Sequence, residues 1–262
     1  MSRVIAVINQ KGGVGKSTTV EALVAGLSLK GYKCLAIDLD AQGNLTYTAG
    51  AKTGGVTSLG LLTGEAQAVD AIQHIKPASK RGKNISWDII ASSKALAGAD
   101  AFVNETGKEY RLKEALESVK QKYDYIVIDT PPALGILTVN ALTACDEVII
   151  PAQADIYSLQ GIEQLNETIK PVKKYTNPSL QIAGILLTRY NPRSVLSREV
   201  ADLTAQLAKK LHTKLYKTTI REAIAIKEAQ ISQQDIFTYA PKAKVAEDYN
   251  HFIDEYLGVI ND

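Results

Sequence analysis

The segment VINQKGGVGKSTTVEAL, residues 7–23, decides the fold. It continues an apolar, β-type run, RVIAVI (residues 3–8), and passes through closely spaced glycines into a helical pattern that begins near Ser17. Glycines lack a Cβ, so backbone N–H groups can converge on an anion, and the start of the helix adds the positive end of its dipole. A strand, a glycine-rich turn and a helix in this order predict a phosphate-binding loop.

The side chains at the end of this loop predict what it binds. Lys16 can reach the β- and γ-phosphates of a nucleotide, and the Ser17 hydroxyl can ligate Mg²⁺. A glycine-rich turn that merely precedes a lysine is the alternative, but it does not account for strand, glycines, Gly-Lys-Ser and helix together. The residues expected to hold the nucleotide here are Gly12, Gly13, Val14, Gly15, Lys16, Ser17 and Thr18.

The rest of the chain predicts an α/β fold, with one doubly wound, mostly parallel sheet and helices on both faces. Short apolar runs alternate with longer helical patterns, and such alternation favours parallel strands joined by right-handed crossovers. Ligands of such sheets bind at the carboxyl ends of the strands. The expected strands are residues 3–8, 33–38, 86–92, 123–129, 146–152 and 181–188.

We expect a single domain over residues 1–262. Residues 50–85, which include the polar run SKRGKN (79–84), are interpreted as a surface excursion with short helices. Residues 241–257 predict a closing amphipathic helix. Its apolar residues at helical spacing are Val245, Tyr249, Phe252 and Tyr256.

Composition excludes several classes of protein. Hydrophobic residues make up 45% of the 262 residues and charged residues 22%, which is typical of a globular core and not of a disordered chain. Cys34 and Cys145 lie in apolar segments without metal-site spacing, so we expect both to be buried. Apolar runs all fall short of the roughly 20 residues that a membrane span needs, and we expect a cytoplasmic protein.

Charge is distributed unevenly along the chain, although the net charge is only +2. Residues 170–227 hold 12 Lys/Arg against three Asp/Glu, whereas the remaining residues hold 18 Lys/Arg against 25 Asp/Glu. Such asymmetry indicates an anionic partner on one face. A solvated basic surface without a partner is the alternative.

One departure from the ordinary loop pattern identifies a resemblance. Gln10 stands where the first glycine of the ordinary pattern is expected, and Lys11 follows it. The form KGGVGKST is the deviant phosphate-binding loop, and with it the chain resembles the ParA/MinD family of ATPases over nearly its whole length. It is most similar to the short, Soj-like branch, which lacks an N-terminal helix-turn-helix extension.

Four further segments carry the resemblance. DLDAQGN matches the family motif after the second strand, with Ala41 in place of the common proline, and YDYIVIDTPPALG matches the second acidic strand. Later family signatures resemble two more stretches of this chain. The four segments are residues 38–44, 123–135, 151–165 and 236–249.

The resemblance implies roles for individual residues. Lys11 would cross the interface of an ATP-bound homodimer to the partner's phosphates, so that Lys11, Lys16 and Asp40 form the catalytic set. Asp40 would position the attacking water, with Asp38 left as a strand-end residue, and Mg²⁺ would be held by Ser17, Asp40 and Asp129. A helix-capping role is the alternative for Asp129. The adenine-side residues would be Arg189, Tyr190 and Thr218, with a packing role left open for Tyr190.

The resemblance also implies a function. The first hypothesis is a slow ATPase, stimulated by a ParB-type partner, that binds DNA non-specifically at the nucleoid and partitions a plasmid or chromosome. Its DNA contacts would be Arg193 and Arg221, although the register of Arg221 is open. Supporting charges would come from Lys173, Lys174, Arg198 and Lys227.

Three alternatives compete with DNA partition. An ATPase of the same fold that positions a protein cargo is the runner-up. A MinD-like membrane-cycling regulator is disfavoured because the last residues, EDYNHFIDEYLGVIND, are acidic and not basic. A nitrogenase-reductase-like electron carrier is disfavoured because Cys145 alone does not supply a cluster-ligand set.

Overall fold

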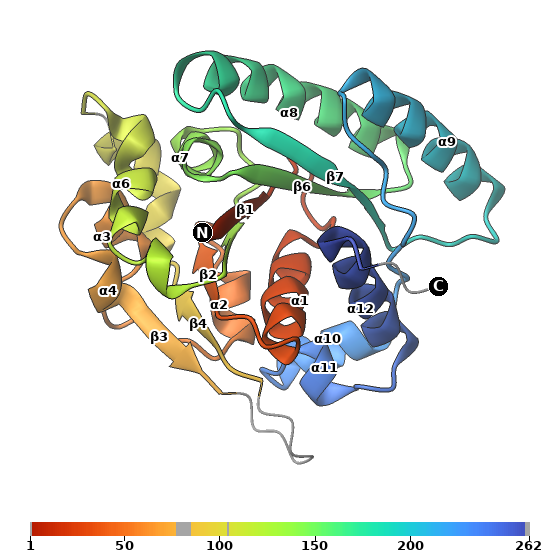
Figure 1. The fold of residues 1–262 in the computed structure, drawn as a ribbon, viewed down its shortest axis with the longest axis horizontal. Helices are drawn as coiled ribbons and strands as arrows, with labels where there is room; N and C mark the ends of the chain where they lie inside the picture. The colour runs from red at the N-terminus through yellow and green to blue at the C-terminus, as the bar shows by residue number, and fades with distance from the viewer. Residues whose placement is uncertain (1, 77–84, 104, 260–262) are drawn as a thin grey trace.

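The computed structural model describes residues 2–76, 85–103 and 105–259. The polar run 79–84, predicted to belong to a surface excursion, lies outside the described residues. Among the described residues, seven strands form one sheet in the order β3-β4-β2-β5-β1-β6-β7 (Figure 1). The strands are β1 (Arg3–Val7), β2 (Cys34–Asp38), β3 (Ile72–Ile75), β4 (Trp87–Ile90), β5 (Tyr125–Asp129), β6 (Glu147–Gln153) and β7 (Gln181–Thr188).

All six predicted strands are confirmed to within three residues at each end, and every pairing among them is parallel. Strand β3 was missed. It pairs with β4 in the antiparallel direction at the edge of the sheet, and the side chain of its His74 is about half exposed. An edge strand is buried on fewer sides than a central one, so IQHI lacks the continuous apolar run that marks the others.

Helices connect the strands and cover both faces of the sheet (Figure 1). The α-helices are α1 (Lys16–Leu29), α2 (Asn44–Thr48), α3 (Ser58–Thr63), α4 (Ala68–Ala71), α5 (Ala99–Phe102), α6 (Arg111–Glu117), α7 (Ile136–Ala144), α8 (Ile156–Tyr175), α9 (Val195–Lys210), α10 (Ile224–Ile231), α11 (Ile236–Tyr239) and α12 (Lys244–Leu257). Three short 3-10 helices are η1 (Lys94–Gly98), η2 (Lys108–Tyr110) and η3 (Lys120–Lys122).

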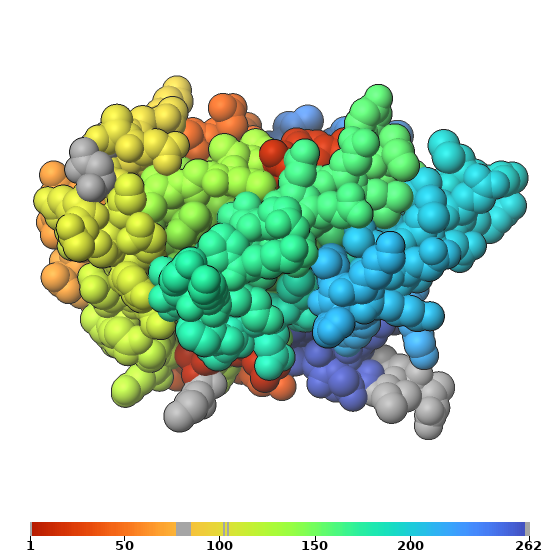
Figure 2. All heavy atoms as spheres, turned by 90° about the horizontal axis from the view of Figure 1, so that it is seen from above, coloured from red at the N-terminus to blue at the C-terminus, as the bar shows by residue number. Residues whose placement is uncertain are grey.

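The sheet separates two apolar cores. One core joins alternate strand residues to helices α3, α6, α7 and α8, and the other joins the intervening strand residues to α1, α11 and α12. The alternation is visible in β1, where Val4 and Ala6 face the first core and Ile5 and Val7 face the second. Figure 2 shows the molecule from the side of the first core, with helix α9, drawn in cyan, projecting at one end.

The closing helix is confirmed as α12, although it begins at Lys244 and not at Pro241. It packs against α1, the helix that follows the glycine-rich loop, and the two approach closely at Gly26. A Cβ added at Gly26 would lie 2.2 Å from the Ile253 side chain, so a larger residue there would require this buried side chain to move. Cys34 and Cys145 are buried and unpaired, as expected.

Candidate nucleotide-binding site

A pocket of about 650 Å³ opens at the carboxyl edge of the sheet, where the sequence motifs converge. Its floor is the glycine-rich loop, and its walls come from the segments after β2, β5 and β7 and from helix α10. The motif residues that line it are Gly12, Gly13, Val14, Gly15, Lys16, Ser17, Thr18 and Asp40.

The loop has the backbone shape that an anion requires. Gly13 and Gly15 have φ angles of 75° and 86°, in the left-handed region that favours glycine. No atom lies within 4 Å of a Cβ added at Gly12 or Gly13, so the space above the loop is free for a ligand. The N–H groups at the start of α1 face the same space, which makes the loop a cradle for phosphate oxygens.

Side chains from other strands brace the loop. The Thr188 hydroxyl, at the end of β7, donates to the Val14 carbonyl oxygen at 2.8 Å. Gln153, at the end of β6, donates its amide N–H to the Gly13 carbonyl oxygen at 3.1 Å. The Asn9 amide donates to the Pro151 carbonyl oxygen at 2.7 Å, while its Oδ1 accepts from the Lys11 N–H. These bonds fix the loop against β6 and β7 before any nucleotide binds.

Lys16 lies in the pocket with only 7% of its surface exposed. Burial lowers the pKa of its ammonium, and the carboxyl groups of Asp129 and Asp40 oppose that shift. Its Nζ contacts the Lys11 carbonyl oxygen at 3.4 Å, at the outer limit for a hydrogen bond. The ammonium is therefore incompletely solvated, and it would gain from the anionic oxygens of a phosphate.

Asp129 fits a magnesium site. It is fully buried at the end of β5, and neither of its carboxylate oxygens receives a hydrogen bond of ordinary geometry from any residue that the structure describes. Burial and the neighbouring Asp38 carboxyl raise its pKa well above the usual range, against the Ser17 hydroxyl and the Lys16 ammonium. A buried carboxylate that receives no ordinary hydrogen bond, beside a hydroxyl and a second carboxyl group, offers the oxygen ligands that a hard divalent cation prefers. The Ser17 hydroxyl and the carboxyl groups of Asp40 and Asp129 would hold Mg²⁺ there.

Asp38 and Asp40 have different surroundings. Asp38 pairs in register with Asp129 across β2 and β5, and its carboxylate accepts hydrogen bonds from the Asp40 N–H and from Thr46. Burial raises the pKa of Asp38 above its usual range. Asp40 lines the pocket, and one of its carboxylate oxygens accepts from the Gln42 N–H at 3.0 Å. The geometry leaves Asp40, and not Asp38, free to face a ligand.

Lys11 is held within its own chain. Its Nζ lies 2.5 Å from Asp155 Oδ2 and 3.2 Å from Gln153 Oε1. Burial alone would raise the pKa of Asp155, but the Lys11 ammonium and the Ser158 N–H hold it below its usual range. In the single chain, therefore, the ammonium of Lys11 is paired beside the loop.

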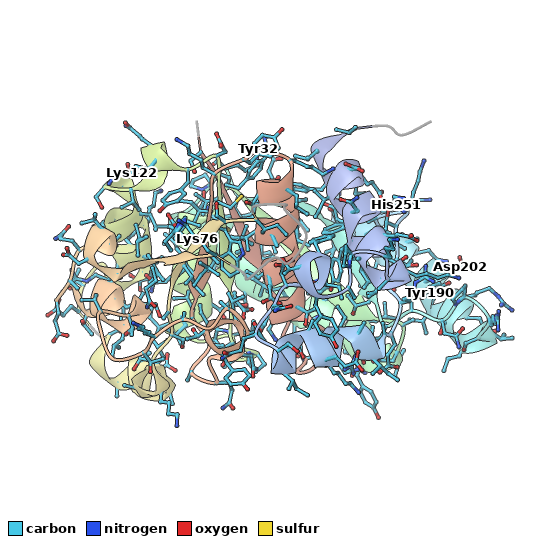
Figure 3. All side chains as sticks on the ribbon, turned by 90° about the horizontal axis from the view of Figure 1, so that it is seen from below. Tyr32, Lys76, Lys122, Tyr190, Asp202 and His251 are labelled. Carbon is cyan, nitrogen blue, oxygen red and sulfur yellow. The ribbon has the colours of Figure 1, made fainter. Side chains whose placement is uncertain are left out.

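The structure divides the residues predicted for the adenine side. Arg189, which has a φ of 49°, lines the pocket together with Thr188 and Ile220. Thr218 lines a second hollow, of about 620 Å³, between the segment before Ile220 and the end of α12. Tyr190 follows Arg189 but is not among the residues that line the nucleotide pocket; Figure 3 labels it near helix α9.

The basic residues predicted to bind DNA lie at opposite ends of the strands, some at the amino edge of the sheet and others at the carboxyl edge. Helix α8 runs back from the end of β6 to the start of β7, so Lys173 and Lys174 in its last turn lie at the amino edge. Arg193 and Arg198 follow the end of β7 at the carboxyl edge. Residues 170–227 therefore do not form one surface in a single chain.

Arg221 and Lys227 are part of the pocket wall. The Arg221 guanidinium makes two bonds to the Asp248 carboxylate, at 2.6 and 2.7 Å, and its backbone N–H makes a third. The charge of Arg221 is thus already paired, which leaves Arg193 as the more accessible arginine of the two predicted contacts.

Sequence reasoning missed several residues of the site. Asn9 follows β1 and Gln153 ends β6, and their position directly after apolar runs could have indicated that they brace the loop. Helix α10 was not predicted as part of the pocket, yet its Gln230 donates to the Thr18 hydroxyl at 3.2 Å. That contact joins residues 212 positions apart, and no local pattern announces it.

Comparisons with known proteins agree with this geometry. A family model described as an AAA domain matches residues 2–182. The sporulation initiation inhibitor protein Soj of Bacillus subtilis is 40% identical over 252 residues, which cover 95% of this chain and 96% of Soj. The chromosome partitioning protein ParA of Caulobacter vibrioides is 37% identical over 253 residues, covering 94% and 91% of the two chains.

One similar solved structure contains a nucleotide and magnesium. Cobyrinic acid a,c-diamide synthase from Mycobacterium smegmatis, with bound ADP and magnesium, superposes with a TM-score of 0.77 at 33% identity. The match covers 98% of this chain and 94% of that one. In the part of this chain that the structure describes, no helix has both the length and the apolar character of a membrane span.

Proposed function

The chain belongs to the ParA/Soj-type family of partition ATPases, and from this premise we propose that it hydrolyses ATP with Mg²⁺, dimerises around the nucleotide and binds DNA without sequence preference. The observation that carries the proposal is the braced loop with Lys16, Asp40 and the donor-free Asp129 around one pocket.

Each residue of the pocket has a part in this proposal. The loop N–H groups and the Lys16 ammonium bind the phosphates and stabilise the charge that develops on them. Ser17, Asp40 and Asp129 would hold Mg²⁺, which would neutralise negative charge on the phosphates. Asp40 orients the attacking water and accepts a proton from it, and the position of Asp40 in the pocket wall supports this role.

Dimerisation would require Lys11 to change partners. Its ammonium leaves Asp155 and Gln153 of its own chain and reaches the phosphates bound by a second copy. Each ATP would then lie within the interface, so the dimer would persist until hydrolysis. A slow basal rate, increased by a ParB-type partner, follows from this use of ATP as a switch.

DNA binding would depend on the dimer. The arginines after β7 would be doubled across the interface, and doubled cationic charge raises affinity for phosphates of any sequence. Such a protein would work in the cytoplasm on the nucleoid and partition a plasmid or a chromosome. A protein cargo met by the same surface is the competing function.

Co-sedimentation with unrelated DNA duplexes tests the proposal. The protein should sediment with DNA in ATP but not in ADP or without nucleotide, and light scattering under the same conditions should show dimers only in ATP. ATP-dependent dimers that retain no duplex at low salt would defeat the DNA function and favour a protein cargo. The absence of dimers in ATP would defeat the switch itself.

A further inference from the structure

Asp40 sits in a short loop between β2 and α2 whose backbone is fixed from outside the loop. Within the loop, the Asp40 N–H donates to Asp38 Oδ1 at 3.0 Å, and the Asp40 carbonyl oxygen accepts from the Gly43 N–H at 2.8 Å. From outside, the hydroxyl of Ser92 donates to the same carbonyl oxygen at 2.5 Å. Ser92 follows β4, the strand that pairs with β2.

These bonds belong to a closed ring. The Ser92 N–H donates to the Thr46 hydroxyl oxygen at 2.8 Å, and that hydroxyl donates to Asp38 Oδ2 at 2.7 Å. Asp38 in turn accepts from Asp40, whose carbonyl oxygen accepts from Ser92. Every donor in the ring therefore has one defined acceptor, and the direction of each bond is fixed.

The ring is dry. Asp38 is fully buried, and the exposed surface of Ser92, Thr46 and Asp40 is 2%, 3% and 8%. A hydrogen bond that is shielded from water holds its geometry more strongly than an exposed one. The exposed part of Asp40 belongs to the pocket wall, whereas Ser92 does not line the pocket.

We propose that Ser92 is a positioning residue for ATP hydrolysis, acting through the backbone of Asp40. Its hydroxyl ties the Asp40 carbonyl oxygen to the segment that follows β4, so that the Asp40 carboxylate meets the water in a fixed position. This inference rests on the proposed role of Asp40. Without the Ser92 hydroxyl, the bond from the Ser92 N–H to Thr46 remains, but the Asp40 carbonyl oxygen loses its bond to Ser92, and the carboxylate samples a wider range of positions.

Steady-state turnover and ATP affinity, measured on the same variants, test the inference. Ser92→Ala should lower kcat by about tenfold or more, since a small misplacement of a catalytic group has a cost of that order. Its dissociation constant for a fluorescent ATP analogue should stay within about twofold of the wild type, since the loss concerns only the chemical step. Ser92→Thr, which keeps the hydroxyl, should restore most of the turnover.

Ser93→Ala is the matched control. The Ser93 hydroxyl accepts from the Ala95 N–H, so this variant also loses one hydroxyl–backbone bond, in the next residue, but none to Asp40. It should lower the melting temperature without changing kcat. If Ser92→Ala turned over as the wild type does, or lost ATP affinity together with kcat, the positioning role would be wrong.

Asp40→Ala separates this inference from the proposed function. Loss of turnover in Asp40→Ala with normal turnover in Ser92→Ala would overturn the role of Ser92 alone. Normal turnover in Asp40→Ala would overturn the proposed chemistry, and the role of Ser92 with it.

Discussion

The phosphate loop and the basic segment from residues 170 to 227 are organised in opposite ways. The loop is eight residues long, from Gln10 to Ser17, and the side chains of Asn9, Gln153 and Thr188 hold it against β6 and β7. The basic segment runs from the end of α8 through β7 and α9 to the start of α10, and because α8 and β7 run in opposite directions, its charges are distributed between the two ends of the strands. A function that depends on one short loop is fixed by a few hydrogen bonds to that loop, whereas a function that depends on summed charge depends on where the chain path places each charge.

The largest expected effect comes from removing the charge at the centre of the loop. Lys16→Ala should weaken ATP binding by about a hundredfold or more, because a buried ammonium–phosphate interaction would be lost where little water can replace it. Titration calorimetry with ATP and Mg²⁺ measures the change. Lys122→Ala, which removes a lysine at the amino edge (labelled in Figure 3), should bind ATP as the wild type does. An equal loss of ATP affinity in both variants would mean that the substitutions act through protein stability and not through a contact with phosphate.

Glu21 contrasts with the exposed lysines of the basic segment, because it is a charge-bearing residue buried within the loop's own helix. Burial, and then Asp235, raise the pKa of Glu21 to about 8, against a hydrogen bond from Thr48. The folded chain therefore keeps this proton up to about pH 8, whereas the unfolded chain releases it near 4.5. Since the folded state binds the extra proton, the free energy of unfolding falls as pH rises between these values.

Glu21→Gln should remove this dependence. The variant should gain stability over the wild type as pH rises from 5 to 8, by about 1 kcal/mol per pH unit at most. Urea unfolding without nucleotide at pH 5, 6.5 and 8 measures the difference, with exposed Glu114→Gln as the control. Parallel pH curves for the wild type and Glu21→Gln would show that the unfolded and folded states bind this proton alike.

The same contrast explains what the sequence could predict. The loop, six strands and helix α12 were predicted because each is encoded within one short window of residues. Ser92 and Thr46 were not, since their bond joins positions 46 residues apart and depends on how β4 lies beside β2. The distribution of Lys174 and Arg193 to opposite edges likewise depends on the path of α8, which composition does not record.

Lys11 lies beside the loop but is not needed to form it, so its loss should have a smaller effect than the loss of Lys16. Lys11→Ala should weaken the ATP-dependent dimer by about tenfold while changing ATP affinity by less than about threefold, since a charge-assisted contact across the interface would be lost. Light scattering over a range of protein concentrations, in ATP and in ADP, measures the dimer. Normal dimerisation of the variant in ATP would exclude a role for Lys11 across the interface.

The smallest and most discriminating effect is expected for DNA affinity, when basic residues at the two edges of the sheet are changed in turn. Arg193 follows β7 at the carboxyl edge with the nucleotide pocket, whereas Lys174 lies at the amino edge, its Nζ 4.8 Å from the centre of the Tyr175 ring. If DNA is bound at the edge where the nucleotide controls dimerisation, only the first charge contributes. Arg193→Glu should then weaken binding to unrelated duplexes by about fivefold and reduce the slope of log affinity against log salt by about one, as expected for one phosphate contact.

Lys174→Glu makes the same change of charge at the other edge and should alter DNA affinity by less than about twofold, through the long-range field alone. Filter binding with ATP at several salt concentrations compares the two variants, and light scattering confirms that both still dimerise. Equal losses would mean that DNA responds to the net charge of the chain and not to one edge. A larger loss for Lys174→Glu would place the DNA on the amino edge, away from the nucleotide, and would remove the physical link between ATP and DNA binding.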